Sequence, residues 1–365
     1  MQTRRNNYLF APMFSFSPEK VTLYTEVSVN KRGTDRFYNA NELRSILAKE
    51  KGIEKPKKAI IKKFHNFEIS DNAYRTLQKK ISWLYYLSKS RYIKTHSGKE
   101  IYNFKMGFLT LTLPSKQVHS TAYITKNYFN QFITEIKKVT KMQNYVWRLE
   151  FQQNRNVHYH LVTDTYIDYH TAQKIWNRII NKDGYVDVYS KKFMGMNLSQ
   201  YYSYITQQAV RYNKNIDNND YYTFQNVAKR YAIQRKNKFS QPNSVDLKSV
   251  SNGKKISFYI SKYFGKKSKN NAECNELDNE ENSFSLRLWF CSRSLSKLDA
   301  IRHYIDEINW SPANLLEKGD AVKYVVHRYC TVIYFEFSKL INTTKKLFAI
   351  LLKRYSLTQG YLPAT

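Results

Sequence analysis

Cysteine is scarce in this chain. The three cysteines, Cys274, Cys291 and Cys330, lie far apart, form no CxxC pair and are odd in number. This usage argues against a disulfide-stapled scaffold and against a zinc finger, and it fits a reducing cytosol.

Long apolar runs are also missing. The sequence has no run of roughly 18 apolar residues, so we expect no membrane-spanning segment and no membrane partner. The N-terminus carries Arg4 and Arg5 but no long apolar stretch before a small-residue cleavage site, so we expect no secretory signal. The pattern GxxxxGK[ST] does not occur, which argues against an attached helicase domain.

Acidic residues are few beside the basic ones. The 365 residues include 60 Lys and Arg against 29 Asp and Glu, a net charge of +31. Such an excess implies a polyanionic partner, most often nucleic acid. The chain also has 31 Tyr, 21 Phe and 5 Trp, and aromatic rings among cations suit single-stranded nucleic acid. An AT-rich genome is an alternative source of the aromatic enrichment, but it explains the charge less well.

The hydrophobic pattern predicts a mixed fold. Alternation predicts strands over 107–115, 144–152 and 157–163, the last two joined by a turn. Helices are predicted over 123–139 and after Asp168 as N-cap, and an earlier helix runs from Ser70, also as N-cap, to about Ser88. Residues 189–250 are interpreted as helices and loops. The order βαββα predicts an α+β fold with helices packed on a central antiparallel sheet.

The sequence His158-Tyr159-His160 is the most informative local feature. Spacing of two in a strand places both imidazoles on one face. Hairpin pairing sets Glu150, on the preceding strand, opposite one of the two histidines. Two neutral imidazoles and a carboxylate can hold a divalent cation with open positions for a phosphate. Alternatively, the histidines are a partly exposed structural pair.

A second feature is the segment YISKYFGK, residues 259–266. On a helix, Tyr259 and Tyr263 lie one turn apart, and Lys262 and Lys266 share an adjoining face. A nearby ammonium stabilises a phenolate and can also neutralise a phosphate. The alternative is that both tyrosines pack a helix into the core.

Three segments together resemble the motifs of HUH endonucleases. They are FLTLTLPS, EFQQNRNVHYHLV and YISKYFGK, in that chain order. The closer resemblance is to rolling-circle replication initiators of microviruses, small single-stranded DNA phages, whose Y-x-x-K-Y-x-x-K pattern matches Tyr259, Lys262, Tyr263 and Lys266. The later segment 287–296 resembles a piece that follows the tyrosine motif in such initiators, and we assign it no chemical role. The resemblance spans roughly residues 104–296.

The resemblance implies a nicking and joining reaction on DNA. His158, His160 and Glu150 would hold Mg²⁺ or Mn²⁺, with Gln152 as the alternative third ligand. Tyr259 would attack first and Tyr263 second, with Lys262 neutralising the phosphate or phenolate. Thr110 and Thr112 would support the sheet under the metal. The residues expected to contact DNA are Lys254, Lys255, Lys266 and Lys267.

The resemblance also implies a setting and a domain layout. The partners would be single-stranded or supercoiled origin DNA, a host helicase and a host DNA polymerase, in the cytoplasm of a bacterial host. The layout would be a basic N-terminal extension (1–100), an endonuclease core (101–272), an acidic loop or linker (273–283) and a C-terminal region packed on the core (284–365). Competing interpretations are an HUH transposase or plasmid relaxase, and a non-catalytic nucleic-acid-binding protein.

Overall fold

The chain forms two compact units in a computed structural model. The first unit comprises segments 1–66, 78–87 and 293–362, and the second comprises 67–77, 88–292 and 363–365. Each unit is described by itself. The structure describes residues 3–5, 8–18, 20–30, 37–39, 69–95, 97–152, 154–211, 219–250, 287–304, 322–327, 330–335, 340 and 342–361.

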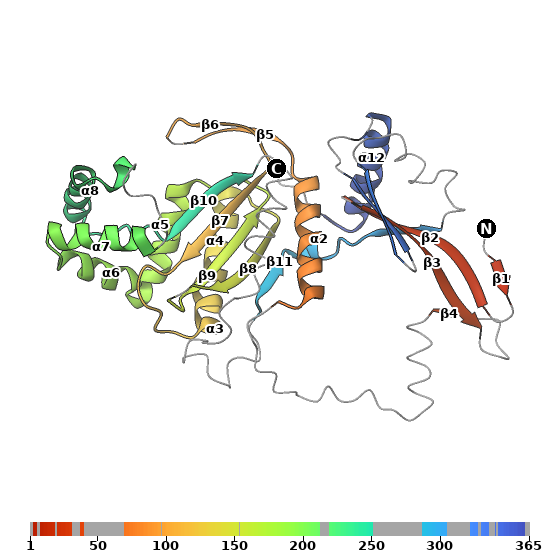
Figure 1. Cartoon of the computed structure of the whole chain (residues 1–365), viewed down its shortest axis with the longest axis horizontal. Helices are drawn as coiled ribbons and strands as arrows, with labels where there is room; N and C mark the ends of the chain where they lie inside the picture. Colours follow the sequence, from red (N-terminus) through yellow and green to blue (C-terminus); the bar gives the residue numbers. More distant parts are fainter. Residues whose placement is uncertain are drawn as a thin grey trace, which may run out of the picture. The chain divides into compact units, whose positions relative to one another are not determined.

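A five-stranded antiparallel sheet is the centre of the second unit (Figure 1). Its strand order is β10-β7-β9-β8-β11, and every neighbouring pair is antiparallel. The predicted α+β class with a central antiparallel sheet is therefore confirmed. The strands are β7 (Met106–Thr112), β8 (Tyr145–Phe151), β9 (Val157–Thr163), β10 (Val245–Val250) and β11 (Trp289–Cys291).

One face of this sheet is apolar and packs against helices. Leu111, Leu149 and Tyr159 lie side by side in register across β7, β9 and β8, and all three are buried. They belong to a core that also includes Phe132 and Trp176. Because strand side chains alternate between faces, the residues between them are left for the opposite face. The covering helices are α3 (Thr121–Ile124), the π-helical turn η1 (Thr125–Phe129), α4 (Asn130–Thr140) and α5 (Tyr169–Ile180).

The predicted helix boundaries hold with one difference. The Asp168 carboxylate accepts a hydrogen bond from the Thr171 backbone N–H at 3.0 Å and caps α5, as predicted. The Ala73 N–H likewise donates to Ser70 Oγ at the start of α2 (Asp71–Leu87), whose residues divide between the two units. The helix predicted over 123–139 is interrupted by the π-helical turn η1.

We expect Trp176→Ala to destabilise the second unit strongly. Trp176 is completely buried, and its indole N–H donates to the Thr112 carbonyl at 2.8 Å. Truncating a buried aromatic side chain costs about 3–5 kcal/mol, since it leaves a cavity and here an unpaired carbonyl. Urea unfolding measures the loss. Val139→Ala is the control, because Val139 is 62 % exposed on α4 and should change stability by no more than about 0.5 kcal/mol.

A three-helix module precedes β10. Its helices pack on a small core of their own, formed by Phe193, Tyr201, Val227 and Phe239. The interpretation of 189–250 as helices and loops is therefore correct for the helices but wrong for 245–250, which form strand β10. The elements are η2 (Asn181–Asp183), α6 (Tyr185–Met194), α7 (Leu198–Arg211), η3 (Asp220–Tyr222) and α8 (Phe224–Lys236). The second unit also contains the hairpin β5 (Arg91–Lys94) and β6 (Glu100–Phe104).

The first unit is a sheet built from both ends of the chain. The strand order is β1-β2-β3-β14-β13, with β12 paired to β2 and β4 to β3. The sequence analysis does not predict this pairing. The elements are β1 (Thr3–Arg5), β2 (Tyr8–Ser17), β3 (Lys20–Asn30), β4 (Phe37–Asn39), α10 (Arg293–Ser296), β12 (Ile301–Tyr304), β13 (Val322–Val326), β14 (Cys330–Phe335) and α12 (Asn342–Thr358).

Several sequence features can be placed on this fold. Cys291 is buried and Cys330 half-buried, and neither forms a disulfide. In the part of the chain that the structure describes, no helix has the length and apolar character to cross a membrane. The acidic segment 273–283 lies outside the described residues, as does Cys274.

Candidate functional site

The polar face of the central sheet gathers the predicted histidines. In the register of β8 and β9, Glu150 lies opposite His158, and Arg148 opposite His160. The expectation that Glu150 faces one of the two histidines is confirmed. On the other side of β9, Thr112 pairs with His158 in the same way. Because directly paired residues share a face, all these side chains project from the side away from the apolar core.

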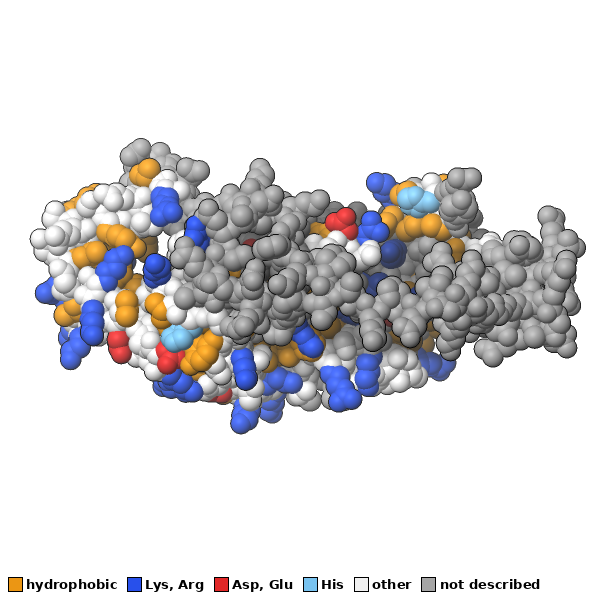
Figure 2. Space-filling view, turned by 90° about the horizontal axis from the view of Figure 1, so that it is seen from below, with side chains coloured by type: hydrophobic (Ala, Val, Ile, Leu, Met, Phe, Trp, Pro, Cys, Tyr) orange, Lys and Arg blue, Asp and Glu red, His pale blue; other side chains and the backbone are white. Residues whose placement is uncertain are grey.

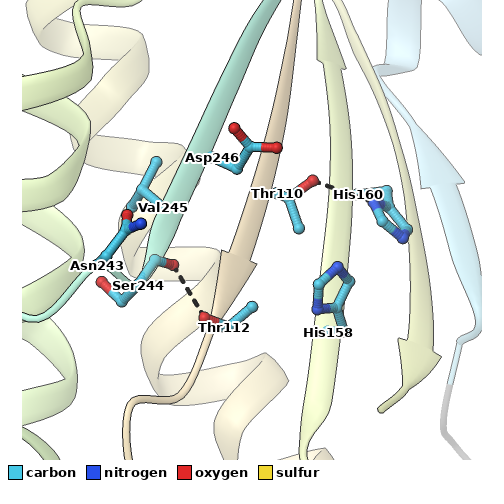
Figure 3. A pocket seen from close by; sticks show the side chains of 8 residues that line it. All are labelled: Thr110, Thr112, His158, His160, Asn243, Ser244, Val245 and Asp246. Carbon is cyan, nitrogen blue, oxygen red and sulfur yellow. Dashed lines mark hydrogen bonds between the residues drawn. The ribbon is translucent and has the colours of Figure 1, made fainter. Parts of the chain in front are cut away.

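A pocket of about 240 Å³ opens on this face. Figure 3 shows His158 and His160 on β9, Thr110 and Thr112 on β7, and Asp246 on β10 around it. The remaining lining residues are Asn243, Ser244 and Val245, at the start of β10. Three neighbouring strands therefore form the pocket, with the two histidines on the central strand of the sheet.

Each imidazole is held by side chains of the neighbouring strands. His160 is buried, with Nε2 3.1 Å from Glu150 Oε2 and Nδ1 3.3 Å from Thr110 Oγ1. His158 Nδ1 lies 3.0 Å from Gln152 Nε2. The two ring centroids are 4.5 Å apart. Thr110 therefore contacts a predicted metal ligand from below, which is the supporting role expected of it.

Burial sets the charge of these groups. Burial and the neighbouring His160 ring lower the pKa of His158 to about 3, so this ring is neutral at physiological pH. Burial also lowers the pKa of Arg148, although the charge of Glu150 opposes this effect. Arg148 Nη1 lies 3.4 Å from Glu150 Oε1. The face thus combines a neutral imidazole, which has a free lone pair, with a partly buried carboxylate.

The donor set fits a divalent cation. Neighbouring ligands around an octahedral ion at about 2.1 Å lie about 3 Å apart, close to the separation of His160 Nε2 and Glu150 Oε2. Glu150 Oε1 is buried and accepts no hydrogen bond from any residue that the structure describes. Turning the Gln152 amide would let its oxygen accept from His158 Nδ1–H, which leaves Nε2 as a ligand.

The ligand set is nevertheless incomplete as it stands. Within the described ranges, no three His, Cys, Asp or Glu side chains already surround one point. Glu150 contacts His160, whereas His158 contacts Gln152. Both candidates for the third ligand thus touch a histidine, and the choice between Glu150 and Gln152 stays open.

We expect the metal-free protein to lose stability as the pH falls, because of His158. The unfolded ring titrates near pH 6.5, but the folded ring has a pKa of about 3. Between these values only the unfolded state binds the proton, so lowering the pH from about 6.5 to about 5 costs about 2 kcal/mol. Urea unfolding in a chelator at the two pH values measures this loss.

The variant His158→Gln should lack this part of the pH dependence. His170→Gln, which replaces an exposed ring on α5, should retain it. A wild-type decrease in the H158Q variant would show that other groups cause the effect.

Sequence reasoning missed the β10 wall of the pocket. Asp246 pairs with Thr110 in register and lines the pocket, and Ser244 accepts a hydrogen bond from Thr112 Oγ1 through its carbonyl at 3.3 Å. The available signal was the alternation of Val245 and Leu247 with polar residues. That pattern predicts a half-buried strand.

The tyrosine motif lies outside the described residues. This holds for Tyr259, Lys262 and Tyr263, and their position relative to the pocket stays a prediction. The same is true of the residues expected to contact DNA, Lys254, Lys255, Lys266 and Lys267. The segment 287–296 is placed in part, because its residues Trp289–Cys291 form β11 and pair with β8 at the sheet edge.

Comparison with known proteins gives one match. Residues 106–268 match the model of a family of replication-associated proteins, described by its ORF2 member. The matched segment contains strands β7 to β10, the pocket and the tyrosine motif. No curated protein and no solved structure matches the chain. The family match points to a rolling-circle replication initiator.

Proposed function

We propose that this replication initiator is an endonuclease of the HUH, microvirus type. It would nick single-stranded DNA at a replication origin, form a 5′-phosphotyrosine and rejoin the strand during rolling-circle replication. The observation that carries the proposal is the pair His158 and His160 beside Glu150, on the central strands of the segment that matches the initiator family.

The described side chains are suited to hold a cation on this face. His158, His160 and Glu150, or Gln152, would hold Mg²⁺ or Mn²⁺. Thr110 and Gln152 orient the two rings by their hydrogen bonds to Nδ1. When bound, the ion would polarise the scissile phosphate and stabilise the charge that develops on its oxygens.

A nucleophile must reach the pocket from outside the described part. No tyrosine lines the pocket there. The hydroxyls of Thr110 and Thr112 contact His160 and the Ser244 carbonyl, and the Ser244 hydroxyl donates to Asn177 Oδ1. These contacts argue against the three hydroxyls as attacking groups.

The chain length permits Tyr259 to reach the histidines. Val250, the last described residue before the motif, pairs with Met106. The four residues from Met106 to Thr110 span about 13 Å of strand. Nine residues separate Val250 from Tyr259 and can span up to about 30 Å. The reach therefore exceeds the distance along the strand.

The proposed reaction is a transesterification. The oxygen of one tyrosine attacks the phosphorus, the bond to the 3′-oxygen breaks, and the 5′-phosphate stays on the tyrosine. Lys262 would neutralise the phosphate or the phenolate. The second tyrosine would then cut the regenerated origin, and the released 3′-hydroxyl would attack the first phosphotyrosine to close the strand. No nucleotide cofactor is needed, because the phosphotyrosine conserves the bond energy.

A nicking assay on single-stranded origin DNA with Mg²⁺ or Mn²⁺ tests the proposal. An initiator yields a protein–DNA conjugate that survives denaturation. A non-catalytic binder yields only a shifted band, and that result would refute the endonuclease. A transposase or plasmid relaxase shares the chemistry, so support of replication from an origin plasmid, with a host helicase and polymerase as partners, separates them from an initiator.

A further inference from the structure

The three-helix module, defined as α6, α7 and α8 with the residues that flank them, is joined directly to the pocket. After α8 the chain continues through 237–244 to Asn243 and Ser244, which line the pocket. This link is fixed by two contacts: the Pro242 carbonyl accepts hydrogen bonds from Gln173 and Asn177 of α5, and the Lys238 carbonyl accepts one from Ser190 of α6. A strand that leaves the pocket past β10 would therefore meet the module.

The exposed charge of the module is mainly positive. Lys229 and Lys236 lie two turns apart on one exposed face of α8, and neither forms an ion pair with a described residue. Lys191, Lys192 and Lys238 are also exposed, against Asp187 and Asp220 as the exposed acidic residues in the described part of the module. On the face drawn in Figure 2, coloured Lys and Arg side chains are likewise far more frequent than Asp and Glu. The module thus suits a polyanion.

Two aromatic rings stand beside this charge. Tyr221 is 54 % exposed and Phe224 is 50 % exposed, at the start of α8. The Arg230 guanidinium lies 3.6 Å from the centre of the Tyr221 ring, and the Phe224 ring is 5.2 Å from that of Tyr202. Neighbours therefore hold both rings in place without burying them. Rings held in this way can stack on nucleobases at a low entropic cost.

We propose that Tyr221, Phe224, Lys229 and Lys236 form a binding surface for single-stranded DNA. The rings stack on unpaired bases, and the lysines contact phosphates. Duplex DNA fits less well, because its bases are already stacked on one another. The surface rests on the proposed function only for the identity of the strand, since binding itself requires neither the metal nor the tyrosine motif.

Fluorescence anisotropy of the full chain with a labelled oligothymidylate, in a chelator, tests the surface. The variant Tyr221→Ala/Phe224→Ala should bind at least about fivefold more weakly for each ring removed, the lower end of what stacking contributes. Val210→Ser, at an exposed apolar residue of α7, is the control and should keep wild-type affinity. Circular dichroism checks that each variant is folded.

The lysines have a separate signature. Lys229→Gln/Lys236→Gln should reduce the slope of log affinity against log salt by about 1.4, or about 0.7 for each phosphate contact with a single strand. Wild-type affinity in the aromatic variant, together with an unchanged salt slope in the lysine variant, would overturn the proposal. So would an equal loss of affinity for a blunt duplex without any preference for single strands.

Failure of this surface can be told apart from failure of the endonuclease. If the wild-type chain forms no covalent adduct, yet the variants lose affinity as stated, the surface stands and the endonuclease fails. If the wild-type chain forms the adduct but the variants bind normally, the endonuclease stands and the surface fails.

Discussion

Replacing Tyr259 and Tyr263 together by phenylalanine should reduce the covalent protein–DNA adduct to background. Phenylalanine keeps the ring but removes the oxygen that would bond to phosphorus, so no phosphotyrosine can form. Binding of single-stranded DNA should be unchanged, because the charge and the rings remain. Denaturing electrophoresis of a labelled origin strand measures the adduct, and anisotropy measures the binding.

The single variants separate the two roles. Tyr259→Phe should abolish the first cut if Tyr259 is the first nucleophile. Tyr263→Phe should still form the adduct but fail to close a circle. Tyr123→Phe is the control, because Tyr123 is exposed and its hydroxyl contacts Asp183, away from the pocket residues. An adduct that persists in the double variant would refute the assignment of the nucleophiles.

The sheet that carries the site could be predicted because its signals are local. The alternation of Leu149 and Tyr159 with polar residues fixes which side chains are buried, and burial fixes the face of His158 and His160. The short turn between β8 and β9 then limits the register, so Glu150 must lie opposite one of the histidines. Period, turn and burial point to the same arrangement.

Contacts between distant segments could not be predicted in the same way. Strand β10 joins β7 across more than a hundred residues, and its partner is chosen by the open edge of the sheet rather than by its own sequence. The pairing of β3 with β14 connects opposite ends of the chain. No turn links these strands, so their sequences give no register. Asp246 was missed for this reason.

The side-chain partners within the site are a third level. The register places Glu150 opposite His158, yet its carboxylate contacts His160, one pair away along β9. Arg148 lies opposite His160 and its guanidinium is 3.4 Å from Glu150 Oε1. A buried carboxylate beside a buried guanidinium is stabilised when it turns toward that charge. The diagonal contact therefore depends on three side chains together, and no pairwise rule of spacing predicts it.

Cleavage should be lost when either imidazole is removed. His160→Ala deletes a buried ring that contacts both Glu150 and Thr110. His158→Ala deletes a ring that burial keeps neutral and able to donate its lone pair. With one nitrogen donor fewer, Mn²⁺ should bind at least about tenfold more weakly, and nicking should fall by at least the same factor.

Metal binding must be measured apart from nicking, because a misfolded variant would also be inactive. Electron paramagnetic resonance of free Mn²⁺ gives the affinity of each variant directly, and unfolding in a chelator gives its stability. His170→Gln, at the exposed ring on α5, should bind Mn²⁺ and nick like the wild type. His160→Gln keeps a polar group beside Glu150 and should fold better than His160→Ala, but it should still lose the metal. If either His160 variant nicked at the wild-type rate, the metal would have to lie elsewhere in the chain, and the pocket on β7, β9 and β10 would lose its role in the reaction.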